Sequence, residues 1–310
     1  MKILVLGAGA IGGYFGGRLV QAGADVSFLV RPRRQAQLRE HGLVVRSPHG
    51  DFTLPVNALL REEIREPADL LLLACKAYDL DAAIEAIAPA MGARTILVPL
   101  LNGLAHIDRL RTTFGPARVA GGSCGIPATL SPDGEVHQLG PLHHIVFGPL
   151  AGSADHTGAK LEALLELFRR TPVSADMDAQ MMRALWEKFV GLATLAAMTC
   201  LMRGTVGDIL ATDEGAALFD ATFAACQAAA RAEGFEPREA PMAVFRTMMS
   251  DRQSLLTASM ARDLESGGPT EGAHVVGDML KRVMAAGIEP GALRAAWCHL
   301  QVAERRRLSA

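Results

Sequence analysis

The chain has 310 residues, 50% of them hydrophobic, and a formal net charge of −2 at neutral pH. This length accommodates two domains, and the near-neutral charge argues against a protein that binds nucleic acid or an anionic membrane surface. The five cysteines are scattered and form no Cys-x-x-Cys pair, which indicates reduced thiols in a cytoplasmic protein.

Residues 2–31 predict a strand, a glycine turn, a helix and a second strand. The apolar run 3–6 leads into a G-x-G-x-x-G turn formed by Gly7, Ala8, Gly9, Ala10, Ile11 and Gly12. In a dinucleotide site, the first glycine makes the tight turn, the second lets the backbone approach a pyrophosphate, and the third lets the helix pack on the strand. The helix N-terminus then offers free N–H groups to the phosphates. We therefore expect these six residues to bind a dinucleotide; the alternative is a tight turn that binds nothing.

The second strand ends at Arg31, where NAD sites usually have an acidic residue that holds the ribose 2′-hydroxyl. The sequence continues Pro32-Arg33-Arg34, so no carboxylate is expected to compete there. A guanidinium can pair bidentately with a 2′-phosphate. The sequence therefore favours NADP(H) over NAD(H). The alternative is a solvated basic loop, an interpretation that suits Arg33 and Arg34 best.

Strands and helices continue to alternate up to about residue 176. Further strands are expected at 43–47, 52–56, 69–74, 95–100 and 117–121. Runs such as 70–73 are apolar without alternation, which is typical of a parallel sheet covered on both faces. Segments 135–139 and 144–148 predict an antiparallel pair around Gly140-Pro141, and an amphipathic helix at 158–170 precedes a short strand at 172–174. Residues 1–176 are therefore expected to form an α/β, Rossmann-type doubly wound domain.

From about residue 178 strand patterns vanish and Ala/Leu/Met-rich helical segments replace them, at 178–202, 214–233, 239–250, 257–265, 270–286 and 291–306. The longest apolar stretch, 189–202, is shorter than the ~20 residues of a membrane-spanning helix, so we expect a core helix and no membrane partner. Residues 177–310 therefore predict an all-α C-terminal domain that holds the substrate. Its apolar helices are compatible with a homodimer. A cleft between the two domains would let a small substrate meet the nicotinamide.

Short motifs follow these elements in a fixed order: Cys75-Lys76-Ala77-Tyr78, Asn102-Gly103, Trp186-Glu187-Lys188, Thr257-Ala258-Ser259-Met260, Arg262-Asp263 and Pro269-Thr270-Glu271. In this order and spacing, the chain resembles the ketopantoate reductase (2-dehydropantoate 2-reductase) family over nearly its whole length. The resemblance implies an NADP-dependent oxidoreductase that reduces a small 2-oxo acid or related ketone to the 2-hydroxy compound, as in pantothenate biosynthesis.

The resemblance also implies roles for single residues. Lys188 matches the proton donor, and Glu271 matches an acid near both the cofactor and that lysine. Lys76 and Asn102 match cofactor-site positions, and Asn102 and Ser259 match substrate contacts. The chemistry of a lysine suits the role of proton donor. When hydride reaches a ketone, negative charge develops on the ketone oxygen, and an ammonium can stabilise that oxygen and then protonate it.

Each of these residues also has a purely structural explanation. Lys188 could extend its stem along apolar surface at the start of a helix, and a carboxylate at Glu271 would stabilise the first turn of a helix by itself. Ser259 could be an ordinary residue at the N-terminus of a helix, and Lys76 an ordinary surface lysine. Asn102 followed by glycine is also a plain turn signal.

The chain departs from the family where pantoate-specific members have asparagines that bind the substrate. Leu192, Ala196 and Val206 stand at those positions. Losing one buried hydrogen bond costs about 1–3 kcal/mol, so we expect a more apolar pocket and poor use of ketopantoate itself. Arg203 is a candidate replacement anchor for the substrate carboxylate; alternatively it is a solvated arginine at a helix end.

Two other functions stay open at this point. A β-hydroxyacid-type dehydrogenase also pairs these two kinds of domain, although the short distance from Lys188 to the chain end and the Ser259/Glu271 pair argue against it. A non-catalytic NADP(H)-sensing protein is the other, favoured by the missing asparagines. No metal site is expected, because His143 and His144 are neighbours in a predicted strand and would face opposite ways.

Overall fold

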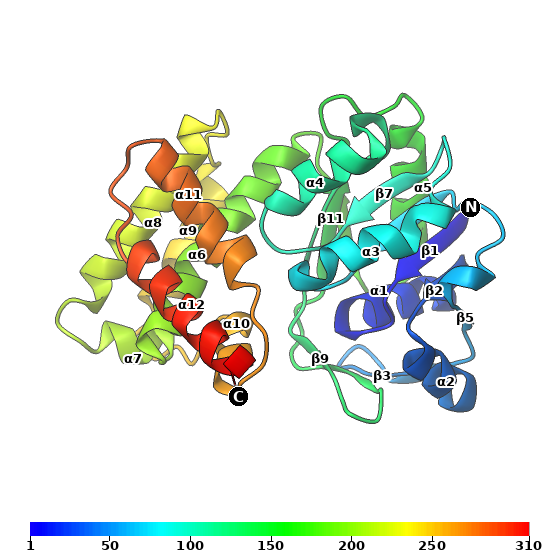
Figure 1. The fold of residues 1–310 in the computed structure, drawn as a ribbon, viewed down its shortest axis with the longest axis horizontal. Helices are drawn as coiled ribbons and strands as arrows, with labels where there is room; N and C mark the ends of the chain where they lie inside the picture. Colours follow the sequence, from blue (N-terminus) through cyan, green and yellow to red (C-terminus); the bar gives the residue numbers. More distant parts are fainter. Residues whose placement is uncertain (310) are drawn as a thin grey trace. The chain divides into compact units, whose positions relative to one another are not determined.

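The computed structural model describes residues 1–309 and divides into two compact units (Figure 1). The first unit contains Met1–Leu101 and His106–Met181. The second contains Asn102–Ala105 and the chain from Met182 onward. The short segment at Asn102 therefore joins the helical unit, which differs from the single boundary near residue 176 that the sequence predicts.

The first unit is built on a parallel five-stranded sheet of order β5-β2-β1-β6-β7. Its strands are β1 (Lys2–Leu6), β2 (Asp25–Leu29), β5 (Asn57–Leu59), β6 (Leu70–Leu73) and β7 (Ile96–Pro99). The chain moves outward from β1 to β2 and β5, then returns to the other side of β1 for β6 and β7. Ligands bind at such a topological switch point, beyond the carboxyl ends of the strands.

Helices cover both faces of this sheet, as its uninterrupted apolar strands predict. They are α1 (Ala10–Gln21), α2 (Pro32–His41), α3 (Leu80–Ile87), α4 (Ala105–Phe114) and α5 (Thr157–Phe168). Side chains of α1 and α5 pack in one buried hydrophobic cluster, and those of α3 and α4 pack in another. All four residues of β6 are fully buried.

Two smaller sheets complete this unit. One has the order β4-β3-β10-β9, the other β12-β11-β8. Their strands are β3 (Leu43–Arg46), β4 (Phe52–Leu54), β8 (Gly121–Gly125), β9 (Ala128–Leu130), β10 (Val136–Gln138), β11 (His144–Gly148) and β12 (Ser174–Met177).

The predicted antiparallel pairing of 135–139 with 144–148 is wrong. Strand β10 pairs with β3 and β9, whereas β11 pairs with β8 and β12 in the other sheet. The side-chain amide of Gln138 donates to the carbonyls of Gly140 and Leu142 at 2.7 and 3.3 Å, so the intervening segment folds onto Gln138 rather than forming a hairpin. The strand expected at 117–121 is also displaced, because Pro116 starts a 3-10 turn and β8 begins only at Gly121.

Helix α1 lies against both the main sheet and the β4-β3-β10-β9 sheet, and three glycines make this approach possible. A Cβ atom on Gly13 would lie 2.9 Å from Val136 of β10, and one on Gly16 would lie 2.6 Å from Phe28 of β2. A Cβ on Gly17 would lie 2.9 Å from Phe52. These contacts fix the start of α1 over the glycine turn.

The described residues of the second unit form helices and no strand. The helices are α6 (Met181–Met202), α7 (Val206–Leu210), α8 (Gly215–Ala232), α9 (Glu239–Ser250), α10 (Ser259–Glu265), a π-helix (Ala273–Gly277), α11 (Asp278–Ala285) and α12 (Leu293–Ser309). The α/β fold with an all-α second part is confirmed. Helix α7 was not predicted, because it is only five residues long.

Helix α6 has 22 residues and a mean hydropathy of 1.3 over its most apolar window. By length and composition it could cross a membrane, so the short apolar stretch does not by itself exclude a membrane span. However, 72% of that window is buried inside the structure. Burial of this extent is what a core helix shows, and it supports the expected role of α6 by a different observation.

Candidate active site

The glycine turn between β1 and α1 shows which glycines the fold itself requires. Gly7 has a φ of +89°, and its N–H donates to Leu29 at 2.9 Å. A Cβ on Gly12 would lie 2.0 Å from the Gly7 carbonyl oxygen. Gly9 is different, because a Cβ there would meet nothing within 4 Å. The open space over Gly9 leaves room for the close approach of a pyrophosphate that the dinucleotide prediction requires.

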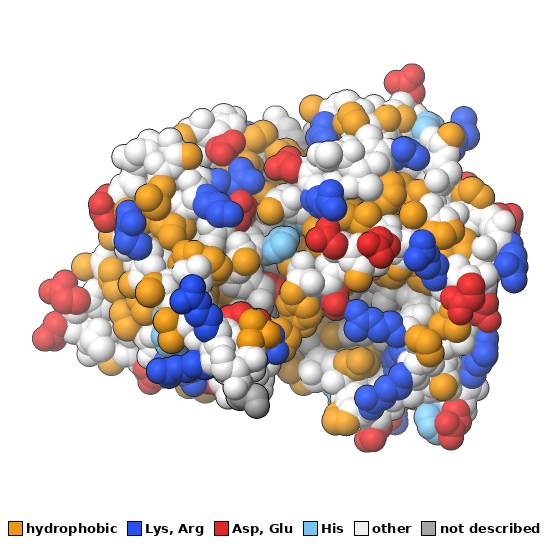
Figure 2. Space-filling model, in the orientation of Figure 1, with side chains coloured by type: hydrophobic (Ala, Val, Ile, Leu, Met, Phe, Trp, Pro, Cys, Tyr) orange, Lys and Arg blue, Asp and Glu red, His pale blue; other side chains and the backbone are white. Residues whose placement is uncertain are grey.

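A cavity of about 740 Å³ opens beyond the carboxyl ends of β1, β2 and β6, within the first unit. Its lining includes the turn residues Gly7, Ala8 and Gly9 together with Arg31 and Lys76. Ala10, Ile11 and Gly12 form the first turn of α1, whose free N–H groups follow Gly9. The volume lies in the range of small-molecule and cofactor sites, and Figure 2 shows Lys and Arg side chains on this unit, interspersed with Asp and Glu side chains.

Arg31 precedes the first turn of α2, and its side chain is 77% exposed. Its guanidinium makes an ion pair of 2.9 Å with Asp79, which also lines the cavity. The expectation that no carboxylate competes at Arg31 is therefore wrong, because Asp79 approaches from 48 residues further along the chain. Asp79 is a site residue that the sequence pattern did not reveal.

The segment after Arg31, for which a solvated basic loop was the alternative, is helix α2, which begins at Pro32. Proline at the first helical position is a start signal that could have located this helix. Arg34 donates to the carbonyls of Ala8 and Gly134 at 3.0 and 2.7 Å. Its burial lowers the pKa of the guanidinium. Arg34 therefore braces the glycine turn, whereas Arg33 lies exposed on the rim of the cavity.

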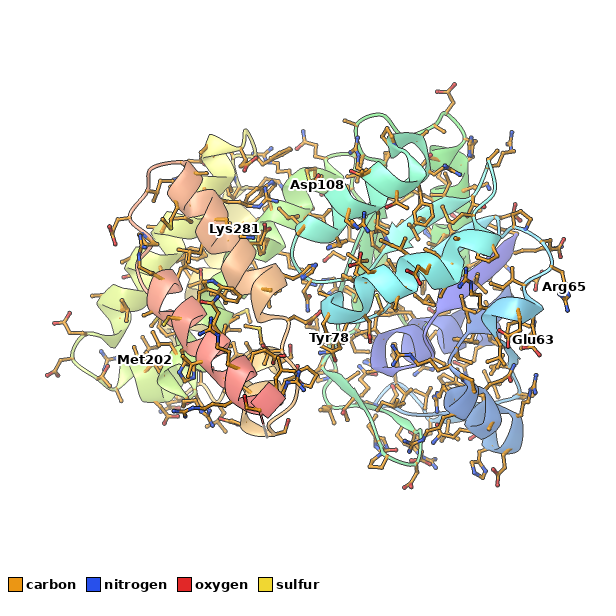
Figure 3. The ribbon with its side chains drawn as sticks, viewed as in Figure 1. Glu63, Arg65, Tyr78, Asp108, Met202 and Lys281 are labelled. Carbon is orange, nitrogen blue, oxygen red and sulfur yellow. The ribbon has the colours of Figure 1, made fainter. Side chains whose placement is uncertain are left out.

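Lys76 follows β6 by three residues and precedes a 3-10 turn, Ala77–Asp79, that leads into α3. It is exposed and lines the cavity. Figure 3 shows Tyr78, which is 51% exposed, at the start of α3. The structure thus brings Lys76 together with the glycine turn and Arg31, as ligand-binding residues at strand ends in this fold should be.

In the helical unit, the side-chain amide of Asn102 donates to Glu271 at 3.4 Å. Glu271 is only 7% exposed. The next residue, Gly103, has a φ of +79°, and a Cβ there would lie 2.5 Å from the His274 carbonyl oxygen. Glu271 stands just before the π-helix Ala273–Gly277 and accepts main-chain bonds from it. Such π-bulges occur frequently at functional sites.

Lys188 is half-buried on α6, next to an ion pair that fixes this part of the helix. The buried Glu187 accepts from the Arg238 guanidinium at 2.6 and 2.8 Å and from the Arg238 main chain at 2.8 Å. One turn after Lys188, Leu192 is also half-buried, whereas Ala196 and Val206 are 1% and 0% exposed. Of the three positions that replace asparagines, Leu192 is therefore the accessible one.

The remaining substrate candidates are Ser259 and Arg203. Ser259 is the exposed first residue of α10. Arg203 follows α6 in a left-handed conformation, with a φ of 55°. It lines a second cavity, whose lining contains neither Lys188 nor Glu271. The structure therefore joins Asn102 to Glu271 but does not bring Arg203 to them.

Among residues 1–309, no group of three His, Cys, Asp or Glu side chains could hold a metal ion. His143 precedes β11 rather than lying in it, and it is 7% exposed. Its Nδ1 is hydrogen-bonded to the Tyr14 hydroxyl at 2.6 Å, and its ring stacks on His49 at 3.6 Å. Burial lowers the pKa of His143 to about 4, so it is a neutral core histidine.

Comparison with known proteins assigns the chain to a protein family. The profile of "Ketopantoate reductase PanE/ApbA" matches residues 3–152, and that of its C-terminal domain matches residues 180–304. An uncharacterised oxidoreductase of Bacillus subtilis, YkpB, is 32% identical over 99% of this chain and all of its own length. The chain belongs to the ketopantoate reductase family. The resemblance stated from the motifs is therefore confirmed.

Two further members agree with this assignment. The 2-dehydropantoate 2-reductase of a Nostoc species is 24% identical over 93% of this chain and 90% of its own. The crystal structure of 2-dehydropantoate 2-reductase from Geobacter metallireducens superposes with a TM-score of 0.86 at 30% identity, covering 98% of this chain and all of that one. As a ketopantoate reductase family member, the protein is an oxidoreductase that acts on CH–OH groups and uses a nicotinamide cofactor. The match of both family profiles, rather than this chemistry, favours the family over the β-hydroxyacid-type alternative.

Proposed function

We propose that this protein reduces the keto group of a 2-oxo acid with NADPH and releases the 2-hydroxy acid. The observation that carries this proposal is the cavity at the switch point of the sheet, where the open backbone at Gly9 lies with Arg31 and Lys76. Family membership supports the reaction class, and the cationic end of the cavity supports the phosphorylated cofactor.

The residues of this cavity suit the parts of NADPH. The free N–H groups at the start of α1 would hold the pyrophosphate beside Gly9. Arg31 would pair with the 2′-phosphate, and Lys76 would contribute a second positive charge at the end of β6. When bound, NADPH supplies the hydride.

Lys188 would stabilise and protonate the oxygen of the ketone as that oxygen gains charge. A neighbouring carboxylate favours the charged form of an ammonium, which is the role we assign to Glu271. The hydrogen bond from Asn102 holds the Glu271 carboxylate in one orientation. The exposed hydroxyl of Ser259 would contact the substrate, whereas Arg203 has no place in this arrangement.

The substrate should carry an apolar tail rather than the hydroxyl group of ketopantoate. Leu192 is half-buried one helical turn from Lys188, so the accessible surface beside the lysine is hydrocarbon. Apolar contact contributes about 25 cal/mol per Å² of buried surface. A branched 2-oxo acid would gain from this wall, and a hydroxylated one would lose a hydrogen-bond partner.

The protein is further proposed to act in the cytoplasm as a homodimer. All five cysteines are free, as expected in a reducing compartment. Val244 and Leu255 of the helical unit are 59% and 85% exposed, which supports a contact between two copies. Sedimentation of the purified protein measures the assembly.

NADPH oxidation, followed by absorbance, tests the reaction with ketopantoate, 4-methyl-2-oxopentanoate and a blank without keto acid. Lys188→Ala should lower kcat by about 10²–10⁴ and leave NADPH affinity unchanged. Lys281→Ala, an exposed lysine of the same unit, is the matched control. Tight NADPH binding with no oxidation by any 2-oxo acid would refute the reductase and favour the non-catalytic NADP(H)-binding alternative.

A further inference from the structure

A second cavity, of about 560 Å³, lies wholly within the helical unit. It is bounded by the C-terminal half of α12, by Arg203 just after α6, and by the loop that contains Gly267, Gly268 and Thr270. Met202, which Figure 3 labels, is the last residue of α6 and directly precedes the cavity residue Arg203. Its lining includes none of the residues that we assign to the reductase reaction, so the inference goes beyond that function.

The lining of this cavity is positively charged. Three arginines, Arg203, Arg306 and Arg307, face one glutamate, Glu304, which leaves an excess of two positive charges. Glu304 is already paired with Arg307 at 2.6 and 2.9 Å. Within residues 1–309, Arg203 and Arg306 make no hydrogen bond or ion pair with a side chain, so their charge is available to an anion.

One polar atom of the lining also lacks a partner. The Nε2 atom of His299 is buried and has no hydrogen-bond partner among the described residues. A buried polar group without a partner is unfavourable, and a ligand oxygen is one group that could satisfy it. Beside His299, Leu264, Leu300 and Ala303 supply an apolar wall.

The backbone at Arg203 gives an independent indication. Among residues 1–309, Arg203 is the one non-glycine residue with a positive φ, at 55°. Glycine is the residue that takes this conformation freely at the end of a helix. Strain of this kind persists where function requires the side chain. The preference of a helix C-terminus for cations applies to Arg203 after α6 as well as to Arg306 and Arg307 of α12, but it does not explain the left-handed backbone at position 203.

We propose that this cavity binds a small organic anion, with a phosphate or carboxylate group held by Arg203 and Arg306 and an apolar body against Leu264 and Leu300. The volume is sufficient for a ligand of this size. Both anionic groups would recognise the same pair of guanidiniums, and the experiment distinguishes them.

The test is calorimetric titration of the full-length protein, saturated with NADPH so that the dinucleotide cavity is filled. The probes are 1-naphthyl phosphate, 1-naphthoate and the neutral 1-naphthol. We expect one molecule of an anionic probe to bind per chain, with 1-naphthol at least about tenfold weaker. The tighter of the two anions identifies the preferred group.

Arg203→Gly and Arg306→Gln should each weaken binding of the better probe by about tenfold. Arg305→Gln is the matched control, because Arg305 is exposed on the same helix and does not line the cavity. Arg203→Gly should also raise the melting temperature, because glycine removes the backbone strain.

Absence of binding by either anion would overturn the proposal. So would binding that Arg203→Gly and Arg306→Gln leave unchanged, or that Arg305→Gln weakens equally, since the attraction would then be a general effect of charge. If Arg203→Gly fails to fold, Arg306→Gln on the exposed helix surface decides the matter alone.

Discussion

Asp79→Asn should strengthen the preference of this enzyme for NADPH over NADH. Asp79 holds the Arg31 guanidinium at 2.9 Å in the dinucleotide cavity. A 2′-phosphate must share that guanidinium with the carboxylate, and it also meets the negative charge of Asp79. A 2′-hydroxyl does neither and can instead donate to Asp79. The native pair therefore reduces the selectivity that Arg31 would give alone.

The magnitude follows from the geometry. The 2′-phosphate carries up to two negative charges, and on the far side of the guanidinium it would lie about 6 Å from the Asp79 carboxylate. Its repulsion by the single charge of that carboxylate therefore costs roughly 1.4 kcal/mol in water. Screening at physiological salt reduces this to about 0.7 kcal/mol. The ion pair itself contributes about 0–1 kcal/mol, because Arg31 and Asp79 are 77% and 38% exposed. We expect a gain of about 1 kcal/mol for NADPH, which is roughly fivefold.

Nicotinamide fluorescence titration of both cofactors measures this effect. NADH affinity should change by less than about twofold, because an asparagine oxygen still accepts from the ribose. At about 1 M salt the gain for NADPH should largely vanish. Asp81→Asn is the matched control, since Asp81 is exposed on α3, pairs with Arg109 and does not line the cavity. A loss of NADPH affinity in Asp79→Asn would refute the reasoning and show that Asp79 serves to position Arg31.

Three further changes probe the site and its support. Gly12→Ala should lower the free energy of unfolding by about 1–3 kcal/mol, because its Cβ meets the Gly7 carbonyl at 2.0 Å. Gly9→Ala should leave stability unchanged and abolish measurable NADPH binding. An equal fall of the melting temperature in the two variants would contradict this. Leu192→Asn should raise kcat/KM for ketopantoate relative to 4-methyl-2-oxopentanoate by about tenfold, and an unchanged ratio would remove Leu192 from the pocket. Burial lowers the His143 pKa from 6.5 to about 4, so the unfolded state binds more protons than the folded state between these pH values. The free energy of unfolding should therefore fall as pH drops from 6.5 toward 4. Denaturant titrations measure this fall in the wild type and in His143→Gln, whose stability should depend less on pH.

The sequence predicts four of the five strands of the main sheet, all but β5, because their signals are local. Leu70–Leu73 is buried on both faces, and a run of leucines shows this directly. The pairing of β10 with β3 joins residues about 90 apart, and periodicity does not reveal such a partner. Helix α2 is not predicted, for another reason. Only Gln35 and Leu38 of this helix are buried, so it lacks the apolar stripe of an amphipathic helix.

The same distinction applies to the site. Residues whose role depends on local geometry, such as the glycines of the turn, can be identified from spacing alone. Asp79 cannot, because its effect arises only when α3 and α2 place it against Arg31. The sequence allows Arg34 to be a solvated loop residue, yet its guanidinium satisfies carbonyl groups in two distant turns. Charge at a sequence position thus indicates a basic site but not which of its cations are already engaged.

The glycine turn shows how structure adds to a motif. A G-x-G-x-x-G pattern is compatible with a turn that binds nothing, since Gly7 and Gly12 are required by the backbone conformation and by close helix–strand packing. Gly9 has an ordinary φ of −83° and open space where its Cβ would lie. Neither conformation nor packing explains a glycine there. Gly9 also lines the 740 Å³ cavity, and the proposed approach of a cofactor pyrophosphate gives a reason for a glycine there.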